Sequence, residues 1–312
     1  MDESAIVKWK KLGLIFCADN INDLMVTGGR TPVPYCIEKS NYKIFFASYD
    51  REGRGRIFNL TIDINQPTKI ASLNTHPIID IGSTGCYDDN GIIPSAILKH
   101  EDKIYLYIIG FSIKNKLMFD TAGGVAVSTD NGKSFNKYDG PVIEKSIDDP
   151  CWASSPFVIY DNKKYKMWYV SCLKWTKEED NNKHYYNIRY KESKDGIYWD
   201  SQSQSAINFQ NEYEYAIARP SIIKDGEQDY KMWYCYRAQK HIDTYRIGYA
   251  ESVNGEEWIR KDEQAGIDVS KAGWDSEMIC YPYVFDHQGD RYMLYNGNGY
   301  GKTGFGLAIY NL

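Results

Sequence analysis

The sequence predicts an all-β fold: a five-bladed β-propeller with four-stranded antiparallel blades, in which residues 1–312 form one domain. Three observations predict it. The chain is rich in aromatic residues, it repeats one pattern five times, and several repeats carry the same hairpin-turn signal. All-β folds of this kind often exceed the usual domain size, so 312 residues do not require a second domain.

The aromatic content favours strands. Aromatic residues make up 15% of the chain, and 27 residues are tyrosines. Aromatic side chains are enriched in strands and bury large areas in a core. We therefore expect a strand-rich core in which aromatic rings supply much of the apolar surface.

Each repeat begins with a proline and a short apolar run, passes through a polar turn, and continues into an aromatic-rich run. Successive repeat prolines are separated by 60, 62, 64 and 62 residues, and they are Pro34, Pro94, Pro156, Pro220 and Pro282. A fixed period of this kind is typical of repeat folds such as propellers. Because proline is tolerated at a strand start, we expect each one to open the innermost strand of a blade.

A third strand with alternating polarity follows in four repeats, and three of these strands lead into a turn that contains Asn-Gly or Asp-Gly, within 128–135, 193–199 and 252–258. These dipeptides supply the positive φ angles that tight hairpins require. The last repeat stops at Leu312 after its third strand. We therefore expect a segment near residues 13–16 to complete the final blade, and a β-sandwich is the alternative fold.

Charge and cysteine use exclude several classes of function. The net charge is −5 and the basic residues are scattered, which argues against nucleic-acid binding. The acidic N-terminus lacks an apolar stretch, and no run of eighteen apolar residues occurs, so we expect a cytoplasmic protein without a membrane span. The seven widely spaced cysteines are expected to be reduced thiols, and no short-spaced ligand pairs predict a metal site. No cofactor is predicted.

Acidic residues gather just before the later repeat prolines, in segments 85–94, 148–156, 212–220 and 274–282. These segments are expected to deliver side chains to the central funnel of the propeller. Carboxylates that share a pocket raise one another's pKa, which is how a general acid is paired with a base or nucleophile in glycoside hydrolysis. The alternative interpretation is that each acid only caps a turn by accepting backbone N–H groups.

The repeat pattern, together with Phe46–Arg51 and the segments 85–94, 214–220, 274–283 and 295–306, resembles the five-bladed propeller glycosidases of the arabinanase, β-xylosidase and invertase type. It is most similar to a glycosyl-hydrolase-like bacterial branch found with polysaccharide biosynthesis genes. The resemblance covers essentially the whole chain. It implies a sugar or sugar-nucleotide substrate and carboxylates that face the funnel.

The family's catalytic motifs are absent. In arabinanases the base is an Asp directly before the inner-strand proline and the acid is a Glu in Glu-Gly-Pro, whereas this chain has Val33, Ile93, Ser155, Arg219 and Tyr281 before its prolines. By position alone, the predicted catalytic residues are Asp89, Glu214 and Glu277, with Asp50, Asp149 and Asp275 in reserve. The predicted substrate-binding residues are Asp50, Arg51, Asp88, Asp149, Trp152, Arg219, Arg237, Asp275 and Asn296.

Three functions stay open from the sequence. The first is a glycoside hydrolase-like enzyme that uses a carboxylate pair, the second is a transferase in cell-surface polysaccharide biosynthesis, and the third is a non-catalytic carbohydrate-binding propeller. The Gly-Lys-Thr at 301–303 suggests a phosphate loop. Its glycine spacing is one residue short and a strand follows it, so a hairpin loop that lines the funnel is the favoured interpretation.

Overall fold

The computed structural model describes residues 8–115, 117–178, 181–238 and 242–310. Residues 1–7, on which part of the expectation of no export signal rests, lie outside them. The described chain is nearly all β, with only a 3₁₀ turn, η1 (Asp262–Gln264), and one helical turn, α1 (Asn298–Gly301). The predicted fold class, all-β, is confirmed.

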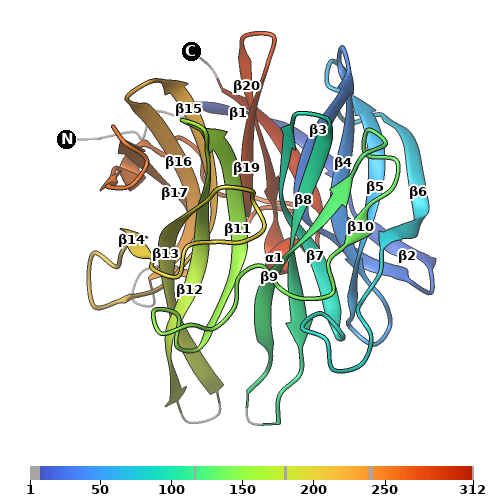
Figure 1. Cartoon of the computed structure of the whole chain (residues 1–312). Helices are drawn as coiled ribbons and strands as arrows, with labels where there is room; N and C mark the ends of the chain where they lie inside the picture. Colours follow the sequence, from blue (N-terminus) through green and yellow to red (C-terminus); the bar gives the residue numbers. More distant parts are fainter. Residues whose placement is uncertain (1–7, 116, 179–180, 239–241, 311–312) are drawn as a thin grey trace.

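The strands form five antiparallel runs (Figure 1). In chain order, these runs are β2 (Ala18–Asn22), β3 (Met25–Glu38), β4 (Asn41–Tyr49), β5 (Gly55–Asp63) and β6 (Ile70–Ile79); β7 (Gly91–His100), β8 (Lys103–Ser112), β9 (Asp120–Ser128) and β10 (Asn136–Lys137); β11 (Trp152–Asp161), β12 (Lys164–Glu178), β13 (Asn181–Ser193) and β14 (Gln204–Ile207); β15 (Glu214–Gly226), β16 (Asp229–Ala238), β17 (Ile242–Ser252) and β18 (Ile259–Arg260); and β19 (Cys280–His287), β20 (Asp290–Asn296), β21 (Phe305–Tyr310) and β1 (Trp9–Phe16). The first run has five strands, one more than the sequence pattern predicts.

The N-terminal strand closes the last run. β1 pairs antiparallel with β21, from Trp9 opposite Tyr310 to Phe16 opposite Phe305. The two ends of the chain therefore share one sheet, which gives that sheet its fourth strand. The expectation that the segment near residues 13–16 completes the final repeat is confirmed.

The first long strands of the five runs contact one another in a closed ring. β3 contacts β7, β7 contacts β11, β11 contacts β15, β15 contacts β19, and β19 returns to β3. Two of these junctions also carry a single parallel bridge between runs, Ala153 with Ala122 and Tyr186 with Ala216. The ring arrangement places the start of each run around a common centre.

The innermost strands share a backbone irregularity. Thr31, Ser155, Arg219 and Tyr281 all adopt positive φ angles, between 51° and 56°, and each directly precedes a proline. The strand register shifts at the same places. In the first run the proline at this shift is Pro32, not Pro34, which pairs normally with Ile44. The prediction that Pro34 is the proline of the first repeat is therefore wrong. That proline is Pro32, which lies 62 residues before Pro94.

The predicted hairpin turns are present. Gly132, Gly196 and Gly255 have φ angles of 74°, 77° and 79°. In each turn a serine hydroxyl at the end of the third strand accepts the N–H of the glycine, at 2.8–2.9 Å. A residue with a Cβ would be strained at these angles, which explains the repeated glycine.

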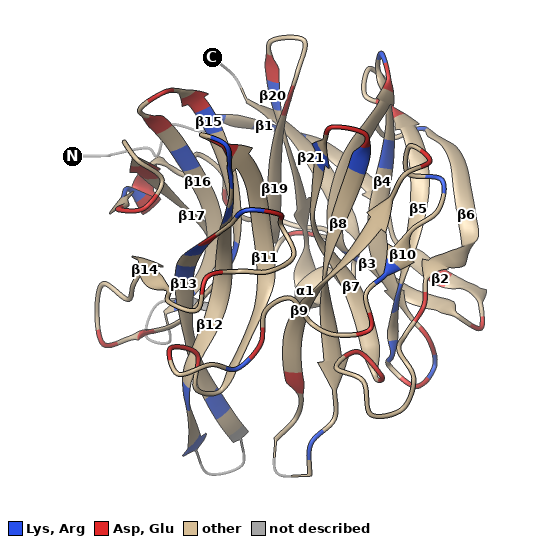
Figure 2. Ribbon diagram, viewed as in Figure 1, with Lys and Arg blue, Asp and Glu red and all other residues tan. Residues whose placement is uncertain are grey.

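Aromatic rings fill the core between the runs, including the fully buried Phe45, Phe58, Trp168 and Tyr234. Charged residues of both signs are scattered over the loops and strand ends (Figure 2). All seven cysteines lack a disulfide partner. Within the described residues, no helix has the length and apolar character needed to cross a membrane.

Candidate functional site

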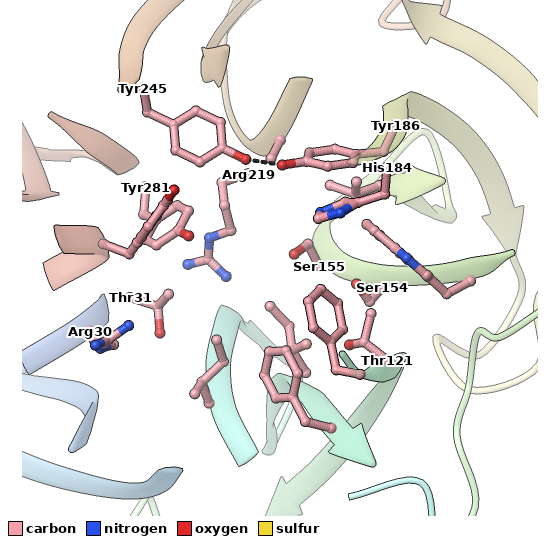
Figure 3. Close-up of a pocket in the computed structure, with 18 of the residues that line it drawn as sticks. Arg30, Thr31, Thr121, Ser154, Ser155, His184, Tyr186, Arg219, Tyr245 and Tyr281 are labelled. Carbon is pink, nitrogen blue, oxygen red and sulfur yellow. Dashed lines mark hydrogen bonds between the residues drawn. The ribbon is translucent and has the colours of Figure 1, made fainter. Parts of the chain in front are cut away.

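A cavity of about 350 Å³ lies where the five innermost strands meet, and β3, β7, β11, β15 and β19 all line it (Figure 3). The hairpins β8–β9 and β12–β13 extend beyond the other strands at one end of the molecule and contribute Phe119 and His184. The size suits a small ligand. We call this cavity the central pocket.

The strained residues of the innermost strands all line the central pocket. Thr31, Ser155, Arg219 and Tyr281 are pocket residues, and each is the positive-φ residue of its strand. A strand bulge redirects a side chain, and positive φ in residues other than glycine is stored strain that clusters at functional sites. For the β-branched Thr31 this conformation is especially unfavourable. The fold therefore tolerates strain in four strands to present these side chains.

Three arginines, Arg30, Arg219 and Arg237, contribute positive charge to the lining. Each lies over a tyrosine ring: Arg30 over Tyr49 at 4.4 Å, Arg219 over Tyr281 at 5.8 Å, and Arg237 over Tyr215 at 4.8 Å. Cation–π contacts of this kind fix a guanidinium group without neutralising it. Among the residues that the structure describes, no Asp or Glu side chain lines the pocket.

Aromatic side chains and a histidine line the pocket beside Arg237, which lies 5.3 Å from the ring centroid of Tyr245. The hydroxyls of Tyr186 and Tyr245 are hydrogen-bonded to each other, and both rings are buried. His184 stacks on Tyr186 at 4.9 Å. Burial, with a smaller contribution from Arg237, lowers the pKa of His184 to about 4, so this imidazole is neutral at physiological pH.

Several buried polar atoms of the wall have no partner within the described protein. They include Oγ1 of Thr31, Nε1 of Trp152 and Nδ1 of His184. Thr31 is 1% exposed and Trp152 is 5% exposed. A buried polar group without a partner is costly. The three residues that carry these atoms all line the central pocket.

The structure places three of the predicted binding residues in the central pocket: Trp152, Arg219 and Arg237. Asn296 lies just behind it and is fully buried. Its Oδ1 accepts the backbone N–H of Thr31 at 2.7 Å, and its Nδ2 donates to the carbonyls of Gly29 and Gly304. Asn296 therefore holds the strained Thr31 in place and links the last run to the first.

The three predicted catalytic acids lie apart from one another and outside this lining. Glu214 is buried in an ion pair with Arg260, at 2.7 Å. Glu277 is exposed beside Asn298. Asp89 accepts the backbone N–H of Gly85 at 2.8 Å. The geometry brings no two of them together as an acid–base pair in the central pocket: Glu214 and Asp89 have partners within their own run or loop, and Glu277 lines a different cavity.

The other predicted acids also have structural partners. Asp50 binds Arg54 and Arg56, Asp88 binds Lys137, and Asp275 binds Lys11 at 2.7 Å and accepts from Tyr295. Asp149 is fully buried and accepts from Ser146 and Tyr169. Arg51 is 74% exposed near Asp23. None of the five is a pocket residue, and their partners support the interpretation that acids before the inner strands are structural.

The sequence reasoning missed Arg30, Thr31, Tyr186, Tyr245 and Tyr281 as pocket residues. One signal could have found two of them: Thr31 and Tyr281 directly precede inner-strand prolines, as Ser155 and Arg219 do. The expectation that the glycine-rich loop lines the funnel is confirmed, because Tyr300 reaches the pocket. Phosphate-loop geometry is not formed, since α1 is a single turn with positive φ angles at Gly299 and Tyr300.

Solved structures that share this fold include glycoside hydrolases. The chain matches a glycoside hydrolase (TM-score 0.68, 15% identity, 96% of this chain and 90% of that one) and an α-L-arabinofuranosidase of Podospora anserina in complex with cellotriose (TM-score 0.69, 10% identity, 99% and 98%). An exo-1,5-α-L-arabinanase from a bovine ruminal metagenomic library matches with a TM-score of 0.61 and 17% identity, over 90% of this chain and 92% of that one. The protein therefore has the fold of the propeller-type glycoside hydrolases.

The sequence comparison identifies a closer group. The chain is 37% identical over 302 residues to the uncharacterized proteins MT1551 and Rv1502 of two Mycobacterium tuberculosis strains, covering 96% of this chain and 98% of theirs. It belongs to the same family as these two proteins. No family model matches the chain.

Replacing Ser155 with glycine should relieve strain in the pocket wall. Ser155 has a φ angle of 55°, and glycine adopts this conformation without a steric penalty. We expect Ser155→Gly to raise the free energy of unfolding by about 0.5 to 1 kcal/mol, as measured by urea denaturation. Ser154→Gly, one residue earlier and without a positive φ, should destabilise the protein. Equal effects in the two variants would contradict the strain.

Proposed function

We propose that the protein is a carbohydrate-active propeller of the glycoside hydrolase-like type that recognises one sugar unit in the central pocket. The five antiparallel runs are the five blades of this propeller. The observation that supports the proposal most directly is the composition of the pocket wall, which combines aromatic rings with buried polar atoms that have no partner in the protein. Sugars bind through stacking on rings and through hydrogen bonds to their hydroxyls.

The central pocket supports sugar recognition better than it supports glycoside hydrolysis, because hydrolysis would need a carboxylate pair. Glycoside hydrolysis generally uses two carboxyl groups that flank the scissile bond. The described lining of the central pocket offers arginines, tyrosines, serines and a neutral histidine instead. The pocket is therefore equipped to bind and orient a sugar without that pair. A cytoplasmic location and a role in polysaccharide biosynthesis stay predictions from the sequence.

A second candidate function is hydrolysis in an adjoining cleft. A polar cavity of about 630 Å³ shares Thr121 with the central pocket and is lined by Asp89, Asp120, Asp139 and Glu144. Asp89 is the one predicted catalytic residue with other carboxylates around the same cavity. If this cleft cleaves glycosides, the wild-type protein should release nitrophenol from at least one member of a nitrophenyl glycoside panel. Asp89→Asn should then abolish that release.

Trp152 provides a direct test of sugar recognition. Its indole Nε1 is buried without a partner in the described protein, so Trp152→Phe removes a donor from the pocket wall without breaking a hydrogen bond within the protein. We expect this variant to bind its sugar about threefold to tenfold more weakly, as one lost hydrogen bond implies, with little change in stability. Calorimetric titration against a panel of pentoses, hexoses and hexuronates measures the change.

The matched control is Trp258→Phe. The Nε1 of Trp258 donates to the carbonyl of Gly255 at 2.9 Å, away from the pocket. Its loss should lower stability and leave sugar affinity unchanged. If no sugar in the panel binds the wild-type protein, or if both variants bind as it does, the proposed function is not supported.

A further inference from the structure

Arginines outside the central pocket that are buried or half-buried are paired with carboxylates. Arg56 lies 2.6 Å from Asp50, and Arg260 lies 2.7 Å from Glu214. Arg291 pairs with both Asp225 and Asp286. This is the expected pattern, because a buried charge without a counter-charge is costly.

The three pocket arginines break that pattern. Within the described part of the chain, no carboxylate forms an ion pair with Arg30, Arg219 or Arg237. Arg219 is 5% exposed, and its hydrogen bonds are one from Nη1 to the carbonyl of Pro94 at 3.2 Å and one to Oγ of Ser95 at 3.1 Å. Both acceptors are neutral. Burial lowers the pKa of Arg219 to about 10, as expected for a guanidinium without a counter-charge.

The charges converge on one region. Figure 3 shows the guanidinium group of Arg219 directed into the pocket between Tyr281 and Ser155. Arg30, on β3, has a buried Nε without a partner. Arg237 is held by the hydroxyls of Tyr215 and Tyr300. All three arginines line the same cavity.

We propose, resting on the proposed sugar recognition, that the ligand is an anionic sugar whose carboxylate or phosphate group is bound by Arg219 together with Arg30 and Arg237. The anion supplies the negative charge that no carboxylate of the described pocket lining provides. Guanidinium groups recognise both oxyanions through paired N–H donors. The aromatic wall around Trp152 and Tyr186 then receives the sugar ring. A uronic acid and a sugar phosphate are the two sources of this chemistry.

Matched ligand pairs test the anionic group. The ligands are glucose, glucuronate and glucose 1-phosphate, together with their galactose counterparts. Within each set the first sugar is neutral, the second carries a carboxylate and the third carries a phosphate. We expect the wild-type protein to bind at least one anionic member roughly tenfold or more tightly than its neutral partner, as a charge-assisted hydrogen bond to a buried group implies. The tighter of the carboxylate and phosphate members identifies the source.

Substitutions of the pocket arginines test whether the preference for anionic sugars arises in the central pocket. Arg219→Gln should remove most of the preference for the anionic sugar, and Arg30→Gln, at a partly buried position without a hydrogen bond, should reduce it without a folding defect. Arg51→Gln, at the exposed arginine, is the matched control and should keep the full preference. Circular dichroism verifies that each variant is folded.

The outcomes separate the two proposals. Equal binding of neutral and anionic sugars, unchanged in Arg219→Gln and Arg30→Gln, overturns the anionic inference and leaves sugar recognition intact. Failure of every sugar to bind overturns sugar recognition itself. If acetate or inorganic phosphate binds as tightly as the sugar acids, the arginines form a simple anion site and the sugar assignment fails.

Discussion

Replacing Asp149 with alanine lowers the free energy of unfolding by about 3–5 kcal/mol, the usual cost of removing one partner from a buried ion pair. Asp149 is fully buried. Its carboxylate accepts from the hydroxyl of Tyr169 at 3.1 Å and lies 3.6 Å from Nζ of Lys191. Lys191 is itself 8% exposed, so the substitution leaves a buried ammonium group without its carboxylate. Urea denaturation measures the loss.

The neighbouring Asp148 is the control. Its carboxylate accepts the backbone N–H of Ser203 at 3.0 Å from a more exposed position. Asp148→Ala should therefore destabilise the protein much less than Asp149→Ala. A stable Asp149→Ala protein that has lost sugar binding would contradict the structural role and return Asp149 to the set of ligand-binding residues.

The second large effect is a pH dependence of stability that comes from His184. In the folded protein its pKa is about 4, against an ordinary value of 6.5. The unfolded chain therefore binds more protons between these values, and stability falls as the pH falls from about 6.5 to about 4. The full contribution, present above pH 6.5, is on the order of 3 kcal/mol.

The surroundings of His184 account for this depressed pKa. Arg237 contributes repulsion, and aromatic rings pack around the imidazole, namely Phe119, Trp152, Trp175 and Tyr186. No carboxylate offsets these effects among the described pocket residues. His184→Gln should flatten the loss of stability between pH 6.5 and pH 4, whereas His76→Gln, at an exposed histidine, should keep it. Identical pH profiles for all three proteins would show that His184 does not carry the effect.

Much of the fold could be predicted because its signals are local. Strand alternation, the turn glycines and the recurring proline lie within short stretches, and each corresponds to a feature of one run. The first run is the exception. The apolar run after Pro34 pointed to that proline, but the strand bulges at Thr31 and Pro32. A bulge that shifts the register by so little leaves no mark in the pattern of apolar residues.

The central pocket could be predicted only in part because its properties depend on distant partners. Glu214 and Asp275 looked like free acids in the sequence, but their counter-ions, Arg260 and Lys11, lie 46 and 264 residues away. Local sequence could not show that these acids are neutralised or that Arg219 is not. The positive φ angles of the residues before the inner-strand prolines, which place Thr31, Ser155, Arg219 and Tyr281 in the pocket lining, also leave no local mark in the sequence.

We infer that the central pocket, with its aromatic rings and with arginines that no carboxylate pairs in the described residues, binds an anionic sugar. A crystal structure of the protein soaked with glucuronate, and in parallel with glucose 1-phosphate, tests it most directly. We expect a sugar ring beside Trp152 and Tyr186, with its carboxylate or phosphate on the guanidinium group of Arg219. A sugar bound only in the cleft beside Asp89, or with its charged group turned away from Arg219, would contradict it.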